Sequence, residues 1–592
     1  MIRTRTHRSG LPDPGATVPS EPLISVIVPT HNVAPWIDDL MRSVLGQTHR
    51  NLDVVVLDDH STDGTFQILQ RYADADRRVR VLLNPGHGGG SARNAGVAEA
   101  RGEYLAFADG DDIVPHDAYA LMVERLEVSG SDMAVGNFAV FGPSHLRRRN
   151  QSVPTYDAAL SHVTVGDVPS LLRDRVCWNK LYRTDWYRWN GITFSTSLRS
   201  NDIYAGTVAY ACAQVEILTE PVYVYRQRVG GSSMTSAKTS APSMLDHFRE
   251  ERKCADVVAT MSPAAVDYYY RNMLRFDSWA HLQGLWSESD GSDTAPEIVE
   301  ILEILGGLVK SATPRSAEAL KKAQRWVYRL IAAGASDLLR FGEASTVSDF
   351  YLLTMTDTSC WDAVEEALGP DAAEFFAYII QDELPDLMIA SGEEDRTTLH
   401  AIIDAIVAAD QRYGLAHRSG PLGGEIIRAA HARHEEDSLV LAAAQRNRAG
   451  VRITRTAPTR FTVDVSPATA TCVLRHSRGA VEPLEARGTA PAEVDVSALA
   501  RGAWSVLATL ELSDRTVEYR PRLNGLEART HRYDAFRVIE GRNGAVELAV
   551  GRGPLVVAAV RRQARTAVSK AARRVNGAGS SLARRLRTGR SS

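Results

Sequence analysis

The chain alternates between two hydrophobic patterns over residues 23–142. Four short runs rich in Val, Ile and Leu are typical of strands, at residues 24–29, 52–57, 78–83 and 104–108. The segments between and after them have the apolar spacing of helices, at residues 36–47, 62–73, 91–100 and 116–128. Strands buried on both faces lose the alternation of apolar and polar positions, and strand-helix-strand repetition closes into a parallel sheet. The pattern therefore predicts an α/β fold with a doubly wound, mostly parallel sheet.

Beyond about residue 240 the pattern changes twice. Helical spacing continues to about residue 444, and Ile298, Ile301, Leu302 and Leu305, for example, share one helix face. Apolar and polar positions then alternate in part, which is typical of a small β-sandwich, at residues 460–465, 503–508 and 517–521. We therefore expect five regions: a disordered leader at 1–22, the α/β domain at 23–240, a helical linker domain at 241–447, a β-sandwich domain at 448–553 and a basic tail at 554–592.

The composition is that of a soluble globular protein. Of the 592 residues, 44% are hydrophobic and 24% are charged, and the formal net charge is −4. The five cysteines are scattered and form no CxxC pair, which favours a reducing compartment and argues against a disulfide framework or a zinc site. No stretch approaches the roughly 18 apolar residues of a membrane span, and the leader lacks the apolar run of a secretory signal. We therefore expect a cytoplasmic protein.

Polar side chains follow the predicted strands at their carboxyl ends, where ligands of such sheets bind. After the second run, Asp58 and Asp59 precede Ser61, Thr62 and Asp63. The last three are good helix N-cap residues, which explains them without a ligand. Two adjacent aspartates are not explained in this way, and one of them can accept the imide N–H of a uracil. Both interpretations are open at this point.

Two further segments at the same edge contain candidate phosphate and metal ligands. Residues 84–96 form a Gly-rich loop that opens a helix, which can present backbone N–H groups and Arg93 to a phosphate, although many such loops have no ligand. Residues 108–112, ADGDD, can be a solvated turn, since Asp and Gly are common in turns. However, Asp109 and Asp111 at the end of a parallel strand also suit Mg²⁺ or Mn²⁺, which are held by one or two carboxylates and substrate phosphates.

The order of these motifs resembles the family 2 glycosyltransferases, which have the GT-A fold. The shared segments, between residues 24 and 236, are SVIVPTHN, VLDDHSTDGT, an Asn followed by GGSARNAG, YLAFADGDD, CWNKLYR and SNDIYAG. Each segment alone is common, whereas their combination at these spacings is specific. With its helical linker and β-rich C-terminal region, the chain is most similar to the wall teichoic acid glycosyltransferases of the TarS and TarP type.

This resemblance implies a site for a UDP-sugar and a divalent cation, Mg²⁺ or Mn²⁺. It assigns six residues to that site: the backbone around Pro29 and the Asp59 carboxylate at the uracil, Asn84 and Arg93 close to the nucleotide, Asp109 at the ribose and the metal, and Asp111 as the main metal ligand. These roles follow from the resemblance and not from the spacing alone.

The resemblance also implies a catalytic base in the segment SNDIYAG. The family usually has a Glu-Asp pair before a helix, and here Asn201 and Asp202 stand in its place. Asp202 therefore matches the base, while Asn201 departs from the usual glutamate. An isolated aspartate at this position would be read as a helix N-cap. Arg226, Arg228 and the serines at 232–233 lie where a loop can close over a diphosphate, and surface solvation is an equally open interpretation of each.

The sequence therefore predicts a metal-dependent, inverting glycosyltransferase. It would transfer a sugar from a UDP-sugar to a hydroxyl of a cell-envelope polymer. The acceptor can be teichoic acid, another glycan or a lipid-linked glycan. A nucleotidyltransferase is an alternative, although the first strand lacks the expected Gly-rich loop with a basic residue. A catalytically dead nucleotide-sugar-binding scaffold is another, although Asp59, Asp109, Asp111 and Asp202 are intact. No nucleic-acid partner is expected.

The C-terminal regions suggest two further interactions. Residues 554–592 contain ten Lys or Arg and no Asp or Glu. Such a segment can be a solvated tail or a basic amphipathic helix on the anionic inner face of the cell membrane. The resemblance also implies that the β-sandwich domain can assemble a homo-oligomer, which would multiply the tails and their avidity.

Overall fold

The computed structural model describes residues 21–142, 145–148, 153–197, 199–228, 240–288, 296–394, 396–446 and, between 450 and 550, the strands and residues 512–513. The chain divides into two compact units, Met1–Thr346 and Val347–Ser592. The predicted leader, the serines at 232–233 and the basic tail lie wholly or almost wholly outside the described residues, so these expectations stay predictions. The predicted domain boundaries at residues 240, 447 and 553 also stay predictions.

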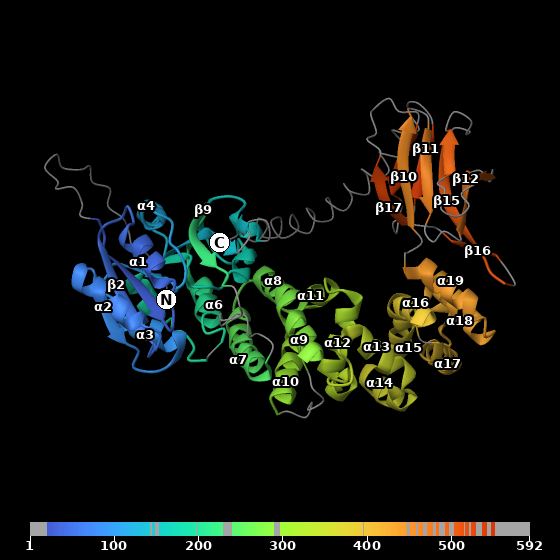
Figure 1. Ribbon diagram of the computed structural model, residues 1–592, viewed down its shortest axis with the longest axis horizontal. Helices are drawn as coiled ribbons and strands as arrows, with labels where there is room; N and C mark the ends of the chain where they lie inside the picture. The colour runs from blue at the N-terminus through green and yellow to red at the C-terminus, as the bar shows by residue number, and fades with distance from the viewer. Residues whose placement is uncertain are drawn as a thin grey trace, which may run out of the picture. The chain divides into compact units, whose positions relative to one another are not determined.

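The first unit contains a sheet of nine strands (Figure 1). They are β1 (Ile24–Thr30), β2 (Leu52–Asp58), β3 (Val79–Leu83), β4 (Tyr104–Phe107), β5 (Met133–Gly142), β6 (His145–Arg148), β7 (Leu160–Val163), β8 (Lys180–Arg183) and β9 (Val215–Arg226). Their order is β3-β2-β1-β4-β8-β5-β9-β7, with β6 paired to β5. Neighbours in the half β3-β2-β1-β4 are parallel, as are β5 and β9, whereas β6, β7 and β8 pair antiparallel. The predicted α/β fold is confirmed.

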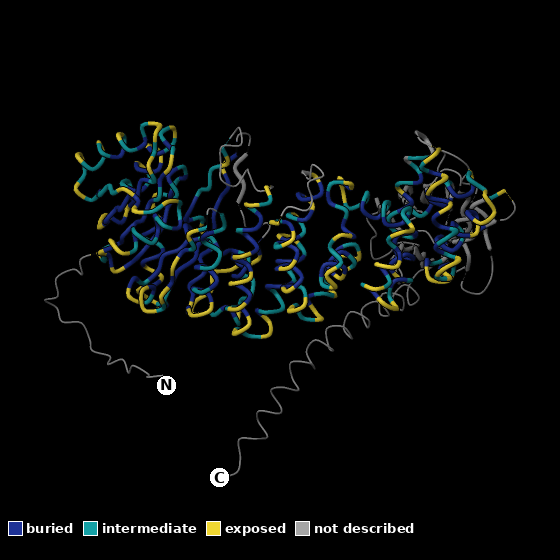
Figure 2. Tube along the Cα trace, turned by 90° about the horizontal axis from the view of Figure 1, so that it is seen from below, coloured by how far each residue is buried: buried dark blue, intermediate teal, exposed yellow. Residues whose placement is uncertain are grey.

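Four helices connect and follow the parallel strands, close to the predicted positions: α1 (Ile37–Leu45), α2 (Thr65–Ala75), α3 (Gly88–Glu99) and α4 (Ala118–Ser129). Helices α1 and α2 contact each other, while α3 packs on β1 and β2. Every residue of β2, and every residue of β1 except Pro29, is buried, which explains the unbroken apolar runs (Figure 2). A Cβ on Gly96 would lie 2.2 Å from a methyl of Ile27, so the glycine permits α3 to approach the sheet closely.

The remaining helices follow the sheet in chain order. In the first unit they are α5 (Thr184–Trp189), α6 (Ile203–Cys212), α7 (Ala241–Val258), α8 (Pro263–Asn272), α9 (Trp279–Glu288), α10 (Pro296–Ser311), α11 (Pro314–Glu318) and α12 (Lys322–Ala333). In the second unit they are α13 (Val347–Thr356), α14 (Trp361–Leu368), α15 (Ala372–Tyr378), α16 (Leu384–Glu394), α17 (Arg396–Tyr413), α18 (Gly420–His431) and α19 (Glu435–Arg446). The four apolar residues predicted to share one face of α10 are all buried, and α10 packs between α7 and α12.

The second unit ends in two sheets, which confirms the predicted β-rich region. Their strands are β10 (Gly450–Ala457), β11 (Arg460–Val465), β12 (Ala470–His476), β13 (Val481–Leu484), β14 (Ala492–Asp495), β15 (Gly502–Glu511), β16 (Thr516–Tyr519), β17 (Arg522–Glu527), β18 (Phe536–Glu540) and β19 (Val546–Val550). One sheet has the order β14-β11-β10-β17, and the other has the order β13-β12-β15-β19-β18 with β16 paired to β15. Among the described residues, no helix has both the length and the apolar character that crossing a bilayer requires.

Candidate active site

The candidate site is built at the carboxyl ends of the parallel strands. The backbone N–H of Asp59 donates to the carbonyl of Thr30 at 2.8 Å, and that of Asn84 donates to the carbonyl of Asp58 at 2.8 Å. These bonds extend the pairing of β1, β2 and β3 by one residue each. The polar residues that the sequence places after separate strands therefore lie at one edge of the sheet.

The two adjacent aspartates after β2 have different environments. Asp58 is buried, and its carboxylate accepts hydrogen bonds from the Thr30 hydroxyl at 3.1 Å and from the N–H and hydroxyl of Ser61 at 3.0 and 2.7 Å. Asp59 retains 14% side-chain exposure, and it accepts hydrogen bonds from Asn84 Nδ2 and from the Gly88 N–H, both at 2.8 Å. Asp58 therefore stabilises the turn, whereas Asp59 is the carboxylate that remains accessible beside Asn84.

The Gly-rich loop is closed onto this edge rather than open. Its first helical N–H, at Gly88, is used by Asp59, and the Asn84 side-chain oxygen accepts from the Gly86 N–H at 3.3 Å and the Ser91 hydroxyl at 3.0 Å. A Cβ on Gly90 would lie 1.8 Å from the carbonyl oxygen of Ser195, so only glycine fits there. The loop thus brings the start of α3 against the segment between α5 and α6.

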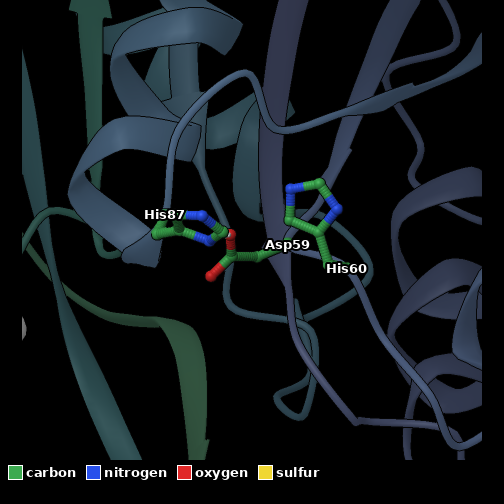
Figure 3. A group of neighbouring side chains, drawn as sticks. All are labelled: Asp59, His60 and His87. Atoms are coloured by element: carbon green, nitrogen blue, oxygen red, sulfur yellow. Dashed lines mark ion pairs between the residues drawn. The ribbon is translucent and has the colours of Figure 1, made fainter.

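Two histidines that the sequence reasoning did not single out flank Asp59 (Figure 3). Ligand atoms of Asp59, His60 and His87 all lie within 4.8 Å of one another, and the imidazole centroids are 5.2 Å apart. Imidazole nitrogens with one carboxylate oxygen are a donor set that suits zinc and other first-row transition metals better than Mg²⁺. Sequence pattern gave little signal for this group, because the histidines belong to loops joined only by the fold.

Arg93 connects the two halves of the candidate site. Its guanidinium donates to the Asp109 carboxylate at 2.6 Å and to the Asn201 side-chain oxygen at 2.9 Å. The same group lies over the ring of Phe194, 5.4 Å from the centroid, and the residue is 8% exposed. Within the described residues its Nε is buried without a hydrogen-bond partner. The structure thus brings Arg93 and Asp109, both predicted site residues, into direct contact.

The segment after β4 is supported by β9. The hydroxyl of Tyr223 accepts from the Asp109 N–H and donates to the Asp112 carboxylate, each at 2.9 Å. Asp112 is fully buried and also accepts from the Arg226 N–H at 2.7 Å. Burial and the neighbouring carboxylates of Asp111 and Asp109 raise the pKa of Asp112 well above its usual value. Asp112 therefore has a structural role in shaping the turn, and Tyr223 was not found by sequence reasoning.

Asp111 is a carboxylate with a cation already beside it. Arg228 Nε donates to its side chain at 2.6 Å, and the Arg228 guanidinium lies 4.3 Å from the ring centroid of Trp36. Burial and the nearby Asp109 raise the pKa of Asp111, while Arg228 opposes this shift. Hard carboxylate oxygens with excess negative charge fit Mg²⁺ or Mn²⁺, so the residues present are compatible with the predicted metal.

Gly110 brings this acidic turn against the end of β1. A Cβ at Gly110 would lie 3.0 Å from methyl groups of Thr30 and Val33 and 3.5 Å from the carbonyl oxygen of Pro29. Pro29, the residue predicted at the nucleobase, is therefore adjacent to the turn that contains Asp109 and Asp111. The segment CWNKLYR supports the same region, because the ring of Trp178 stacks on Tyr223 with centroids 4.4 Å apart.

Asp202 occupies the N-cap position of α6, but its side chain makes no capping hydrogen bond. Among the described residues, no side-chain hydrogen bond to its carboxylate is found, and the residue is only partly exposed. Burial raises the pKa of Asp202, Arg93 lowers it and Asp109 raises it, with a net upward shift. The capping interpretation therefore does not account for this carboxylate, and it lies within the electrostatic reach of Arg93 and Asp109.

Comparison with known proteins adds the family. Residues 25–189 match the family model described as Glycosyl transferase family 2. The chain contains a family 2 glycosyltransferase domain. The matched range includes β1 from its second residue, the whole of β2 to β4, and all six residues predicted at the donor site.

Proteins with sequences similar to this chain are named as glycosyltransferases. An uncharacterized glycosyltransferase, EpsJ of Bacillus subtilis strain 168, is 29% identical over 239 residues, which cover 39% of this chain and 67% of EpsJ. A putative teichuronic acid biosynthesis glycosyltransferase of the same strain, TuaG, is 44% identical over 93 residues, 16% of this chain and 37% of TuaG. The structure of S. aureus TarS 1–349 in complex with UDP-GlcNAc aligns with a TM-score of 0.46 at 20% identity, covering 56% of this chain and 90% of that one.

Proposed function

We propose that the family 2 domain is an inverting glycosyltransferase that transfers a sugar from a UDP-sugar to a hydroxyl of a cell-envelope polymer, such as a teichoic acid or another glycan. The observation that carries the proposal is that the site contains two carboxylates, Asp111 and Asp202, with different surroundings. Asp111 lies in a cluster of carboxylates that attracts cations, whereas the Asp202 side chain makes no capping hydrogen bond to α6. Asp111 is therefore suited to bind the cation of a metal diphosphate, and Asp202 is suited to accept a proton.

The donor nucleotide is assigned to the edge formed by β1, β2 and β3. Asp59 is held in place by Asn84 and Gly88, and its oxygens retain further acceptor capacity, so it can accept the imide N–H of uracil. Pro29 belongs to β1, which lies between β2, followed by Asp59, and β4, followed by the acidic turn. The distance between the nucleobase and the phosphates of a nucleotide is thus spanned by residues at one edge of the sheet.

Asp111 and Asp109 are the residues that would hold Mg²⁺ or Mn²⁺. A bound cation supplies Lewis-acid stabilisation of the negative charge that grows on the departing diphosphate. Arg228, now paired with Asp111, and Arg226, which donates to the Asp111 carbonyl at 2.8 Å, lie beside this turn. Both arginines can donate to phosphate oxygens when the donor binds.

Asp202 is proposed as the general base. The acceptor oxygen forms a bond to the anomeric carbon from the face opposite the diphosphate, the bond to the diphosphate breaks, and the acceptor proton passes to Asp202. Burial raises the pKa of Asp202, which makes its carboxylate a stronger base toward the acceptor proton. Arg93 donates to Asp109 and to Asn201, the residue before Asp202, so it can hold the acidic turn and the segment of the proposed base in place.

The proposed acceptor is a polymer of the cell envelope. TuaG, which shares 44% identity over 93 residues, is named for teichuronic acid biosynthesis. An envelope polymer assembled from nucleotide-activated sugars would place the reaction in the cytoplasm, at its membrane face. Either a polymer or a lipid-linked glycan would present a hydroxyl whose proton Asp202 can accept.

A thermal-shift panel of nucleotide sugars with Mn²⁺ tests the proposal, because a ligand that binds only the folded state raises its stability. UDP-sugars should raise the melting temperature of the wild type, and the variant D59A should lose much of this shift. Slow hydrolysis of the same UDP-sugar without acceptor should accompany binding, which distinguishes a transferase from a nucleotide-binding scaffold. If no nucleotide sugar shifts the wild type, the donor assignment is wrong.

A further inference from the structure

A hollow lies at the end of the parallel strands opposite the candidate active site. Its volume is about 570 Å³, and it is lined by Leu23, Arg50, Asn51, Leu52, Asp53, Asp76, Arg77, Arg78, Arg80 and Arg101. These residues precede or begin β1, β2, β3 and β4, so the hollow lies where the parallel strands start. Five arginines and two aspartates leave the lining with a formal charge of +3.

Two of the arginines form the wall of the hollow. Arg80 donates to both oxygens of Asp53, at 2.9 and 3.0 Å, and to the carbonyl of Glu99 at 2.8 Å. Arg78 donates to Asp76 and also to the backbone carbonyls of Leu45 and Arg50, at 3.2 and 3.3 Å. Their charges are balanced by neighbouring carboxylates, and their positions are held by backbone contacts. The wall is therefore a built structure rather than a set of free surface side chains.

The other three arginines are more exposed than Arg78 and Arg80. Arg50, Arg77 and Arg101 are exposed, and no hydrogen bond or ion pair of their guanidinium groups is found among the described residues. Their backbones are nevertheless held: the Arg101 N–H donates to the Ser25 hydroxyl at 2.9 Å, and the Arg50 N–H donates to the Glu21 carboxylate at 2.9 Å. The excess positive charge of the hollow thus belongs to three exposed side chains, of which Arg50 interacts electrostatically with Glu21 and Arg77 with Asp76.

We propose that this hollow, which we term the arginine pocket, binds phosphate groups of a polyanionic ligand. Guanidinium groups form bidentate, charge-assisted hydrogen bonds to phosphate, and three exposed ones lining one hollow suit a phosphodiester or a phosphate chain better than a single carboxylate. The shared chemistry is phosphate, and it can be presented by a soluble polyphosphate-type chain or by the headgroups of an anionic lipid surface.

The pocket is distinct from the proposed donor site. The seven residues of β1 separate the two edges, which corresponds to roughly 20 Å at about 3.3 Å per residue. The pocket therefore does not overlap with Asp59, Asp111 or Asp202. Binding there does not depend on the proposed transfer reaction, so the two ideas can fail separately.

The test compares two triple variants of the full chain. R50Q/R77Q/R101Q removes the three exposed guanidinium groups, and R71Q/R125Q/R252Q removes three exposed arginines outside the pocket with the same change of net charge. Binding of fluorescent inorganic polyphosphate is measured by anisotropy at several salt concentrations. Flotation with vesicles of phosphatidylglycerol and phosphatidylcholine provides the lipid arm. Circular dichroism melting checks that each variant folds.

The pocket variant should lose about tenfold or more in affinity for polyphosphate and show a weaker salt dependence, because charge-assisted contacts to phosphate are removed. The control variant should change far less. Loss in the polyphosphate arm alone identifies a soluble polyanion as the source, and loss in the vesicle arm identifies headgroups. Equal loss in both variants, or no binding of either probe by the wild type, overturns the proposal. Should the glutamine variant melt early, R50K/R77K/R101K retains the charge and should retain part of the binding.

Discussion

Arg93 and Asp109 form an ion pair of 2.6 Å between helix α3 and the acidic turn after β4. The same guanidinium reaches Asn201, immediately before the candidate base, so a single side chain joins the proposed donor and acceptor sides. A buried arginine with two oxygen partners restricts both segments, because its rigid fork loses hydrogen bonds when either one moves. The positions of the proposed metal ligands and of the base are therefore mechanically coupled.

Replacing Asp202 by Asn preserves the side-chain volume and removes the base. We expect turnover to fall by about 10²-fold or more while UDP-sugar binding stays close to wild type, because only the transition state loses an interaction. Asparagine is as good an N-cap as aspartate, so α6 should not be destabilised. Steady-state kinetics together with a donor thermal shift check both parts. Turnover within a few-fold of the wild type would assign the base elsewhere.

The pH dependence of the reaction should report the environment of Asp202. Because burial raises its pKa, the acidic limb of kcat/KM should lie above the ordinary aspartate value of about 3.9, with activity lost as the pH falls through it. The isosteric variant N201D adds a negative charge beside the base, which disfavours its ionised form. The limb should then move to higher pH, although Arg93 offsets part of the effect. An unmoved limb in N201D would show that another group controls the profile.

Chelation should inactivate the enzyme reversibly. With EDTA we expect loss of transfer and recovery on addition of Mn²⁺, and D111A should stay inactive at any metal concentration, because its main protein ligand is gone. The matched control is D117A, since Asp117 is exposed nearby and its side chain makes no capping bond to α4. Full activity of the wild type in EDTA would mean that the acidic turn works without a cation.

Removing the hydroxyl of Tyr223 should destabilise the acidic turn. In Y223F the Asp109 N–H and the Asp112 carboxylate each lose a partner, so the free energy of unfolding should fall by about 1–3 kcal/mol. Y187F provides the control, because the buried Tyr187 hydroxyl has no hydrogen-bond partner among the described residues and its removal should cost little. Chemical denaturation measures both variants, and an equal effect of the two would show that the hydroxyl of Tyr223 does not support the turn.

The parallel half of the fold could be predicted because its determinants are local. Strands buried on both faces and helices of regular period leave a strong pattern, and β1 and β2 begin at the predicted residues 24 and 52. Helix α3 begins at Gly88, three residues before the predicted start, because the Asp59 carboxylate accepts from its first N–H. That bond joins positions 29 residues apart in the chain, which no local pattern contains.

The candidate site could be predicted in composition but not in its contacts. Asp59, Asn84, Arg93, Asp109 and Asp111 were singled out, yet their partners depend on register and on loop closure. Tyr223 lies 114 residues after Asp109 along the chain, and its hydroxyl is placed only when β9 joins the sheet. The arginine pocket shows the same limit, since its residues come from the starts of several strands and share no motif.

Asp111 already has Arg228 as an ion-pair partner. In the proposed reaction, binding of the donor and its cation would therefore replace that partner rather than occupy an unpaired carboxylate. A carboxylate that already has a guanidinium beside it gains little net free energy when a cation and its diphosphate replace that partner, since one charge-assisted contact is traded for another. With the proposed UDP-sugar donor, Arg228 would return to Asp111 as UDP departs and would lower the cost of losing the product. A site arranged in this way gives up affinity for a fast release step, and product inhibition should accordingly be weak.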